Sequence, residues 1–199
     1  MKKETIIFIH GVLGNSREYL PIINHLKGHG YSSLYGFSYE ENFGTISLTE
    51  LAKRFDVFIK ELNKKDLVII GLSQGGIIAA YWLEFLGGKE ICKKCITICT
   101  PFYGSYLAYI AKLPGARELR PRSQLLRKIR EAMKENDVDY YGIWNPFDLA
   151  VFPGIHAKMN IFKRGRRVNS ALHNTTFHEE ESLDFILEAV RDKEEKYKL

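Results

Sequence analysis

Residues 67–86 constrain the fold more strongly than any other part of the sequence. The apolar run 67–70 predicts a β-strand that is buried on both faces. It leads directly into Gly-Leu-Ser-Gln-Gly-Gly, and the residues that follow are apolar, as in a buried helix. A serine on a tight strand-to-helix turn needs small neighbours, which Gly71 and Gly75 supply. The segment therefore predicts an α/β fold with Ser73 exposed on the turn.

Strand-like and helix-like segments alternate along the rest of the chain. Strands are predicted at residues 5–9, 31–37, 67–70, 95–99, 140–144 and 159–162. Helices are predicted at residues 15–26, 48–62, 77–86 and 183–190. This alternation predicts a doubly wound, mostly parallel sheet of about six strands. A chain of 199 residues with 45% hydrophobic residues is large enough to form one domain of this kind.

One connection, residues 101–139, is longer than an α/β unit needs. Ser123 has the character of a helix N-cap, and apolar residues at 125, 126, 129 and 133 predict at least one helix there. Two interpretations are open. The segment is either a surface helix packed over the core, or a cap whose aromatic residues line an acyl pocket. In the second case its eight basic residues would contact anionic head groups or a lipid surface.

The net charge of +5 comes from 29 basic and 24 acidic residues. The excess is concentrated in residues 112–134 and 163–167, and no nucleic-acid recognition motif accompanies it. We interpret these clusters as solvated faces and expect no nucleic-acid partner. The longest apolar run has seven residues, whereas a membrane-spanning helix needs about 20. The start of the chain also lacks the apolar core of a signal peptide, so we expect a cytoplasmic protein.

The three cysteines do not form a recognisable metal or disulfide motif. Cys92 and Cys95 have the two-residue spacing of a metal knuckle, but Cys95 and Cys99 lie on a predicted strand and no second pair exists. We therefore expect buried thiols and no metal site.

A serine hydroxyl becomes a strong nucleophile when a histidine accepts its proton and an acid orients that histidine. In this fold the acid and the histidine follow the serine, on loops after later strands. Asp148 follows the strand predicted at residues 140–144, at its C-terminal end. Asp137 and Asp139 precede that strand and would lie at the opposite end of the sheet. We therefore predict Asp148 as the acid.

Three histidines follow Asp148. His156 precedes the last predicted strand, which places it at the wrong end of the sheet. His173 lies in a polar loop after that strand, and His178 adjoins three glutamates at a helix start, where a capping role is natural. We predict His173 as the base and keep His178 as the alternative.

These motifs together resemble the small α/β-hydrolases, and among them the bacterial triacylglycerol lipases and carboxylesterases. The resemblance covers nearly the whole chain. His10-Gly11 resembles the oxyanion-loop dipeptide, and residues 71–76 resemble the nucleophile elbow. Residues 100–105 are similar to the lipase stretch Thr-Pro-His-x-Gly-Ser, and residues 148–151 match the Asp-x-x-Val acid loop.

The chain departs from the family pattern at Leu72, Phe102 and Leu172, where histidine, histidine and glycine are usual. The resemblance implies that the backbone N–H groups of Val12 and Gln74 form the oxyanion hole. It also implies a single domain, residues 1–199, with a minimal six-stranded core and residues 101–139 as an insertion. It implies no cofactor.

We therefore expect a serine hydrolase that cleaves carboxylic esters of acyl chains or lipids through an acyl-enzyme. Two alternatives remain. One is a thioesterase, or another acyl hydrolase or acyltransferase, that uses the same triad. The other is a non-catalytic module of the same fold that binds an anionic partner.

Overall fold

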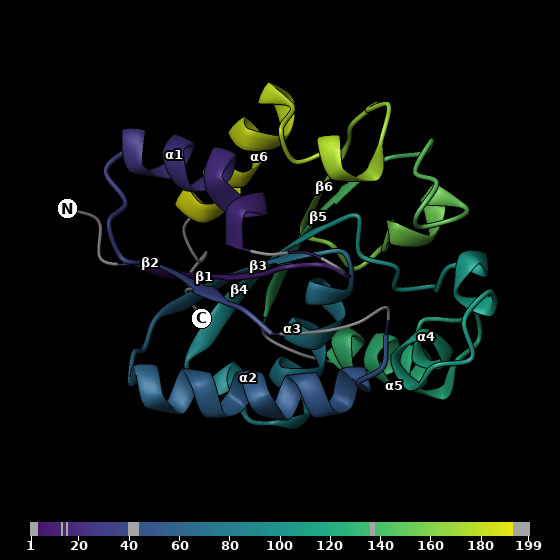
Figure 1. The fold of residues 1–199 in the computed structure, drawn as a ribbon. Helices are drawn as coiled ribbons and strands as arrows, with labels where there is room; N and C mark the ends of the chain where they lie inside the picture. The colour runs from purple at the N-terminus through teal and green to yellow at the C-terminus, as the bar shows by residue number, and fades with distance from the viewer. Residues whose placement is uncertain (1–3, 13, 15, 40–43, 136–137, 193–199) are drawn as a thin grey trace.

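The computed structural model describes residues 4–12, 14, 16–39, 44–135 and 138–192, which form one six-stranded sheet with helices on both faces (Figure 1). Its strands lie in the order β2-β1-β3-β4-β5-β6, and every neighbouring pair is parallel. The strands are β1 (Thr5–Ile9), β2 (Leu34–Phe37), β3 (Leu67–Leu72), β4 (Cys92–Ile98), β5 (Asp139–Trp144) and β6 (Arg164–Arg167). The expected parallel α/β sheet is confirmed.

The helices divide between the two faces of the sheet (Figure 1). One face is covered by α1 (Leu20–Gly28) and α6 (Glu180–Arg191). The other is covered by α2 (Leu48–Leu62), α3 (Gln74–Phe85) and α5 (Gln124–Ala132). The central strand β3 is buried throughout, and its residues alternate between the two hydrophobic clusters. Ile69 packs on the α2 and α3 side, and Ile70 packs on the α1 and α6 side. The both-face burial predicted for this strand is confirmed.

The prediction of a last strand at residues 159–162 is wrong. This segment is a turn, and its apolar side chains Met159, Ile161 and Phe162 pack against the cluster beneath α2 and α3. The strand β6 follows it and is mostly exposed. It lies at the edge of the sheet, where side chains need not be apolar, so hydrophobicity did not identify it.

The second basic cluster of the sequence is largely this edge strand. Arg164 pairs with Glu188 at 2.6 Å and Arg166 pairs with Glu181 at 3.2 Å, which ties β6 to α6. The interpretation of this cluster as a solvated face is consistent with these exposed pairs.

Other boundaries differ by a few residues. The first predicted helix is a 3₁₀ helix, η1 (Ser16–Tyr19), followed by α1, and Asn15 lies outside the described residues. The predicted strand 31–37 begins at Leu34, and β4 begins at Cys92. All three cysteines are buried free thiols, as expected.

The described part of the long connection contains four short helices. They are η3 (Tyr106–Tyr109), α4 (Pro114–Glu118), α5 and η4 (Met133–Glu135). The predicted N-cap is confirmed, since Ser123 Oγ accepts a hydrogen bond from the N–H of Leu126 at 3.2 Å. The inner face of α5 packs on the core, whereas η3 and α4 lie beyond the C-terminal ends of the strands (Figure 1). Within the described ranges, no helix has the length and apolar character needed to cross a membrane.

Candidate functional site

Ser73 occupies a strained turn between β3 and α3. Its backbone has φ 53° and ψ −122°, a conformation that costs a residue with a side chain about 1–3 kcal/mol. The flanking glycines allow close backbone contacts, since a Cβ at Gly71 would lie 2.6 Å from the Cα of Gly76. A Cβ at Gly75 would overlap the carbonyl oxygen of Ile9. The glycines therefore allow β1, β3 and α3 to meet directly beneath the serine.

The loop after β1 lies against this turn. A Cβ added to Gly11 would lie 3.0 Å from the Cβ of Ser73. The N–H of Gly14 donates to the carbonyl of Gly11 at 3.1 Å, which closes a turn around Val12. Gln74 begins α3, where backbone N–H groups have no acceptor within the helix. Val12 and Gln74 both line the same cavity as Ser73.

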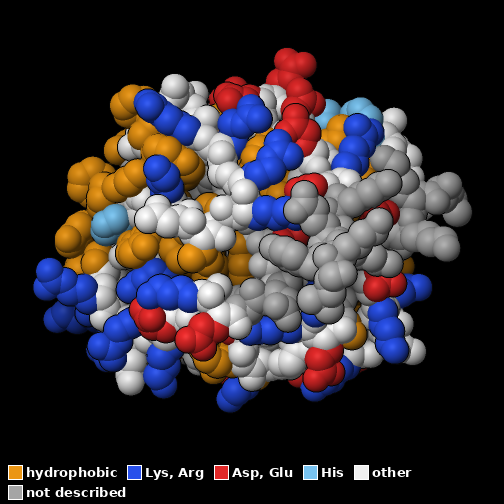
Figure 2. Space-filling model, turned by 180° about the vertical axis from the view of Figure 1, so that it is seen from behind, with side chains coloured by type: hydrophobic (Ala, Val, Ile, Leu, Met, Phe, Trp, Pro, Cys, Tyr) orange, Lys and Arg blue, Asp and Glu red, His pale blue; other side chains and the backbone are white. Residues whose placement is uncertain are grey.

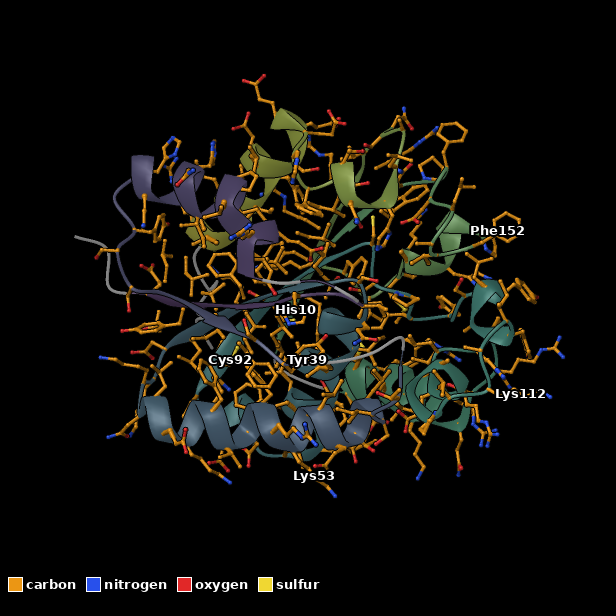
Figure 3. All side chains as sticks on the ribbon, in the orientation of Figure 1. His10, Tyr39, Lys53, Cys92, Lys112 and Phe152 are labelled. Carbon is orange, nitrogen blue, oxygen red and sulfur yellow. The ribbon has the colours of Figure 1, made fainter. Side chains whose placement is uncertain are left out.

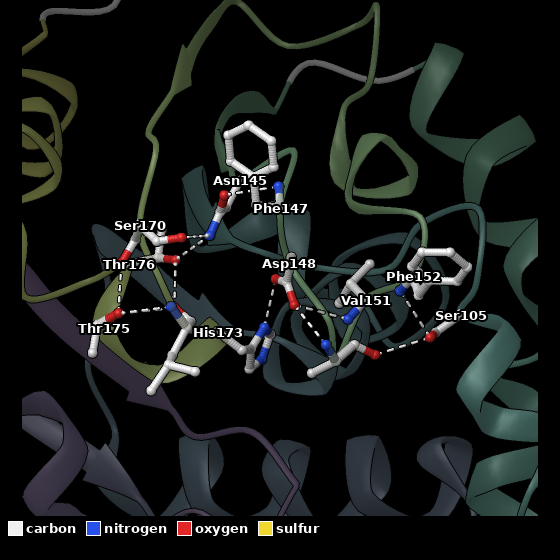
Figure 4. Close-up of polar contacts among 12 residues, drawn as sticks. Ser105, Asn145, Phe147, Asp148, Val151, Phe152, Ser170, His173, Thr175 and Thr176 are labelled. Atoms are coloured by element: carbon white, nitrogen blue, oxygen red, sulfur yellow. Dashed lines mark hydrogen bonds and ion pairs between the residues drawn. The ribbon is translucent and has the colours of Figure 1, made fainter.

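Asp148 and His173 are hydrogen-bonded to each other (Figure 4). The Nδ1–H of His173 donates to Oδ2 of Asp148 at 2.6 Å. The other oxygen, Oδ1, accepts from the backbone N–H groups of Ala150 at 2.8 Å and Val151 at 2.9 Å. Burial disfavours the charged carboxylate, but the hydrogen bonds from His173 and Val151 outweigh it and hold the pKa of Asp148 below its ordinary value. The carboxylate stays ionised and fixes the imidazole tautomer.

A second set of hydrogen bonds holds the loops that carry this pair (Figure 4). The Nδ2 group of Asn145 donates to the carbonyl of Ser170 at 2.9 Å and to Oγ1 of Thr176 at 3.3 Å. Asn145 thereby links the loop after β5 to the loop after β6. On the far side, Ser105 Oγ donates to the carbonyl of Ala150 at 2.9 Å. Sequence reasoning missed Asn145 and gave Ser105 no structural role, because loop-to-loop contacts leave no local pattern.

Cys99 also contacts this pair. The Sγ atom of Cys99, a carboxylate oxygen of Asp148 and a ring nitrogen of His173 all lie within 4.8 Å of one another. Burial and the neighbouring charge of Asp148 raise the pKa of the Cys99 thiol well above its ordinary value. Metal ligation requires the thiolate, so this environment favours a hydrogen-bonding role for the thiol.

The structure separates the three histidines that follow Asp148. The Nδ1 atom of His156 lies 2.8 Å from the carbonyl oxygen of Gly104, and the ring of His178 packs edge-on against Phe177. Of the three, His173 alone is placed against the carboxylate of Asp148.

His10, Tyr39 and Gln74 form a largely buried network beside the Ser73 turn. The rings of His10 and Tyr39 stack with centroids 4.0 Å apart (Figure 3). The Tyr39 hydroxyl donates to the carbonyl of His10 at 2.8 Å and accepts from Nε2 of Gln74 at 2.9 Å. Burial lowers the pKa of His10, whose Nε2 accepts the N–H of Tyr39 at 3.2 Å. Sequence reasoning missed Tyr39, which belongs to no motif.

A cavity of about 510 Å³ opens over the turn. Ser73, Val12, Gln74 and His173 all line it, while the buried Asp148 lies behind His173. The described contacts include no hydrogen bond between Ser73 and His173. Catalytic hydrogen bonds often tighten when a substrate binds, so a shared cavity wall is compatible with proton transfer.

Residues 4–122 match the family model described as the alpha/beta hydrolase fold. Among solved structures, the lipase BlEst2 of Bacillus licheniformis in its propeptide form has a TM-score of 0.74 at 14% identity, over 96% of this chain and 51% of its own. The product of a Listeria innocua gene, lin2722, has a TM-score of 0.72 at 15% identity, over 98% of this chain and 96% of its own.

Two further proteins match a smaller share of this chain. Phospholipase PlaB of Legionella pneumophila has a TM-score of 0.63 at 17% identity, over 72% of this chain and 38% of its own. A probable alcohol acetyltransferase of Cyberlindnera fabianii is 24% identical over an alignment of 164 residues that covers 72% of this chain and 44% of that protein. This chain therefore spans less than half the length of either protein. Since the family model matches more than half of the chain, the chain belongs to the α/β-hydrolase fold family.

Proposed function

We propose that this protein is a serine hydrolase that cleaves carboxylic esters of acyl chains or lipids. The observation that carries the proposal is the 2.6 Å hydrogen bond from His173 to the buried Asp148, at a cavity that His173 shares with Ser73. A serine on a strained turn, a histidine and an ionised acid are the parts that nucleophilic acyl transfer needs.

The reaction proceeds through an acyl-enzyme. Ser73 Oγ attacks the ester carbonyl carbon while Nε2 of His173 accepts its proton. The tetrahedral oxyanion accepts hydrogen bonds from the backbone N–H groups of Val12 and Gln74. The intermediate then expels the alcohol, which takes the proton from His173 and leaves the acyl group on Ser73. Water repeats the sequence and releases the acid, and Asp148 stabilises the imidazolium in both halves.

The cavity lining supports an apolar acyl group. The helices η3 and α4, with the residues that directly follow them, contribute side chains that include Leu107, Ile110 and Leu119. We propose that these helices act as a cap over the acyl chain. Burying each methylene of that chain against such a wall is worth about 0.8 kcal/mol.

The outer surface at this end of the molecule supports contact with lipid. Hydrophobic side chains gather there (Figure 2), and nine of them are at least 41% exposed: Tyr103, Tyr106, Leu107, Tyr109, Ile110, Phe147, Leu149, Phe152 and Ile155. Exposed apolar patches of this kind mark contact surfaces. We propose that this apolar rim touches the lipid in which the substrate resides.

Two of the arginines expected to contact anionic head groups have partners inside the protein. Arg120 donates to the carbonyls of Ala108 at 3.1 Å and Ala111 at 2.8 Å. Arg130 donates to the carbonyl of Phe102 at 2.6 Å. Arg120 thus holds the η3 segment and Arg130 holds the loop before it, so the proposed head-group contact rests on the exposed Arg122 and Arg127.

A second reaction on the same site has specific support. The similarity to a probable alcohol acetyltransferase favours transfer of the acyl group to an alcohol in place of water. The two reactions share the acyl-enzyme and differ only in the acceptor. Hydrolysis gives a free acid, whereas transfer to added ethanol gives an ethyl ester.

Ser73→Ala tests the nucleophile. We expect kcat for 4-nitrophenyl butyrate to fall by about 10³-fold or more, because no other group can form the acyl-enzyme. Labelling by a fluorophosphonate probe, read by mass spectrometry, should disappear while the melting temperature is retained. Persistent labelling at Ser105 or Ser123 would contradict the assignment. No labelling of the wild type would favour the non-catalytic module.

His173→Ala and His178→Ala test the base as a matched pair. The first should lower kcat by about 10²–10⁴-fold, because an unassisted serine hydroxyl is a poor nucleophile at neutral pH. The second should change kcat by no more than about twofold, as a surface substitution does. Steady-state kinetics on both folded variants measures the difference. A reversed order would mean that His178 is the base.

Tyr39→Phe tests whether the buried network positions the oxyanion donors. The change removes a hydroxyl that contacts both the loop before Val12 and the side chain of Gln74. We expect kcat to fall by about fivefold, the equivalent of one hydrogen bond, with KM unchanged. Tyr35→Phe, on β2 four residues earlier and without a described hydrogen bond, is the control. Equal kcat in both variants would show that the hydroxyl has no positioning role.

Vesicle binding tests the lipid contact. We expect the protein to bind anionic vesicles more tightly than neutral ones at low salt, and the difference to shrink as salt rises. The double variant Arg122→Gln, Arg127→Gln should weaken anionic binding by about tenfold. The control Lys53→Gln, on α2 away from the apolar rim (Figure 3), should have no effect. Equal binding by all three proteins would rule out the proposed head-group contact.

A further inference from the structure

One carboxylate of the cavity has no part in the acyl-transfer chemistry. Glu18 lies in η1, directly before α1, and is half-buried. Among the described residues that line the cavity, it alone carries a carboxylate. It occupies space left by Gly14, where an added Cβ would overlap Oε2 of Glu18. The carboxylate is therefore packed into the wall and does not extend freely into solvent.

One oxygen of the Glu18 carboxylate has no hydrogen-bond donor among the described residues. Its Oε2 atom is buried, and no donor in the described part of the chain forms a hydrogen bond with it. Leaving a buried acceptor unsatisfied costs about 1–3 kcal/mol, and more when the group is charged. Burial raises the pKa of Glu18, and the positive charge of His173 partly offsets this. A positive charge in the cavity would remove this cost.

Glu18 shares the cavity wall with His173. Apolar lining residues between Leu107 and Leu119 belong to the segment proposed as the cap, whereas Glu18 comes from η1. Both Glu18 and His173 line the cavity, and their charges interact. The imidazole must lie beside the leaving oxygen in order to protonate it. A carboxylate within electrostatic range of that imidazole therefore faces the alcohol portion of the ester.

We propose that Glu18 binds a positively charged group on the alcohol portion of the substrate, so that the protein prefers cationic esters of apolar acyl chains. This inference rests on the proposed function and adds the charge of the substrate to it. The acyl chain lies against the apolar wall, and the cationic alcohol pairs with Glu18 as Ser73 attacks. Glu18 is thus a specificity residue of this site.

Two esters that differ only in charge test the proposal. Choline butyrate carries a quaternary ammonium, and 3,3-dimethylbutyl butyrate is its neutral isostere with the same acyl group. We expect the wild type to favour the choline ester by about tenfold in kcat/KM, mainly through KM, as for a partly buried ion pair. Glu18→Gln should abolish the preference and Glu18→Lys should reverse it. The exposed Glu61→Gln, on α2, should leave it unchanged.

The outcomes separate this inference from the proposed function. No preference in the folded wild type would overturn the role of Glu18 even if both variants failed to fold. An equal loss of kcat for both esters in Glu18→Gln would also overturn it, because Glu18 would then act on His173 and not on the substrate. If the wild type did not hydrolyse the neutral ester, or hydrolysed it equally well after Ser73→Ala, that result would instead contradict the proposed function.

Discussion

The site depends on close backbone packing beneath Ser73. Gly75 lies against the carbonyl of Ile9, and Gly71 lies against Gly76, so two strands and one helix converge at the serine. Side chains at these positions would separate the elements and move Ser73 relative to the loop that carries Val12. The same convergence forces Ser73 into the left-handed region, a local strain that the buried β3 and α3 sustain. Packing of the central sheet thus sets the geometry of the proposed nucleophile.

The other half of the site is positioned by polar contacts between loops. Asp148 and His173 are 25 residues apart, and Asn145 joins their loops from within the protein. A buried and fully paired amide of this kind is costly to disrupt, so the loops hold one arrangement. The proposed catalytic pair therefore rests on a scaffold that extends beyond the residues that would touch a substrate.

The parts of the structure that follow local patterns were predictable from the sequence. The apolar strand β3 and the glycine-flanked Ser73 combine hydrophobic pattern with turn chemistry, and both appear within about ten residues. The predicted position of the last strand was wrong because the arginines of β6 pair with glutamates of α6. This interaction depends on the tertiary structure and leaves no hydrophobic pattern in the sequence. Tyr39 and Glu18 were missed for the same reason, since each acquires its role only where distant segments meet. The location of Asp148 and His173 was predictable because each residue follows a predicted strand. The C-terminal ends of parallel strands lie at the same edge of the sheet.

The proposed mechanism requires that Ser73 carries the acyl group during turnover. Rapid acid quenching of the wild type with 4-nitrophenyl butyrate, followed by peptide mapping, measures this directly. We expect a butyryl adduct on the peptide that contains Ser73, formed at the rate of 4-nitrophenol release and formed more slowly in Asp148→Asn. A butyryl group on any other residue, or 4-nitrophenol release in Ser73→Ala at the wild-type rate, would contradict it.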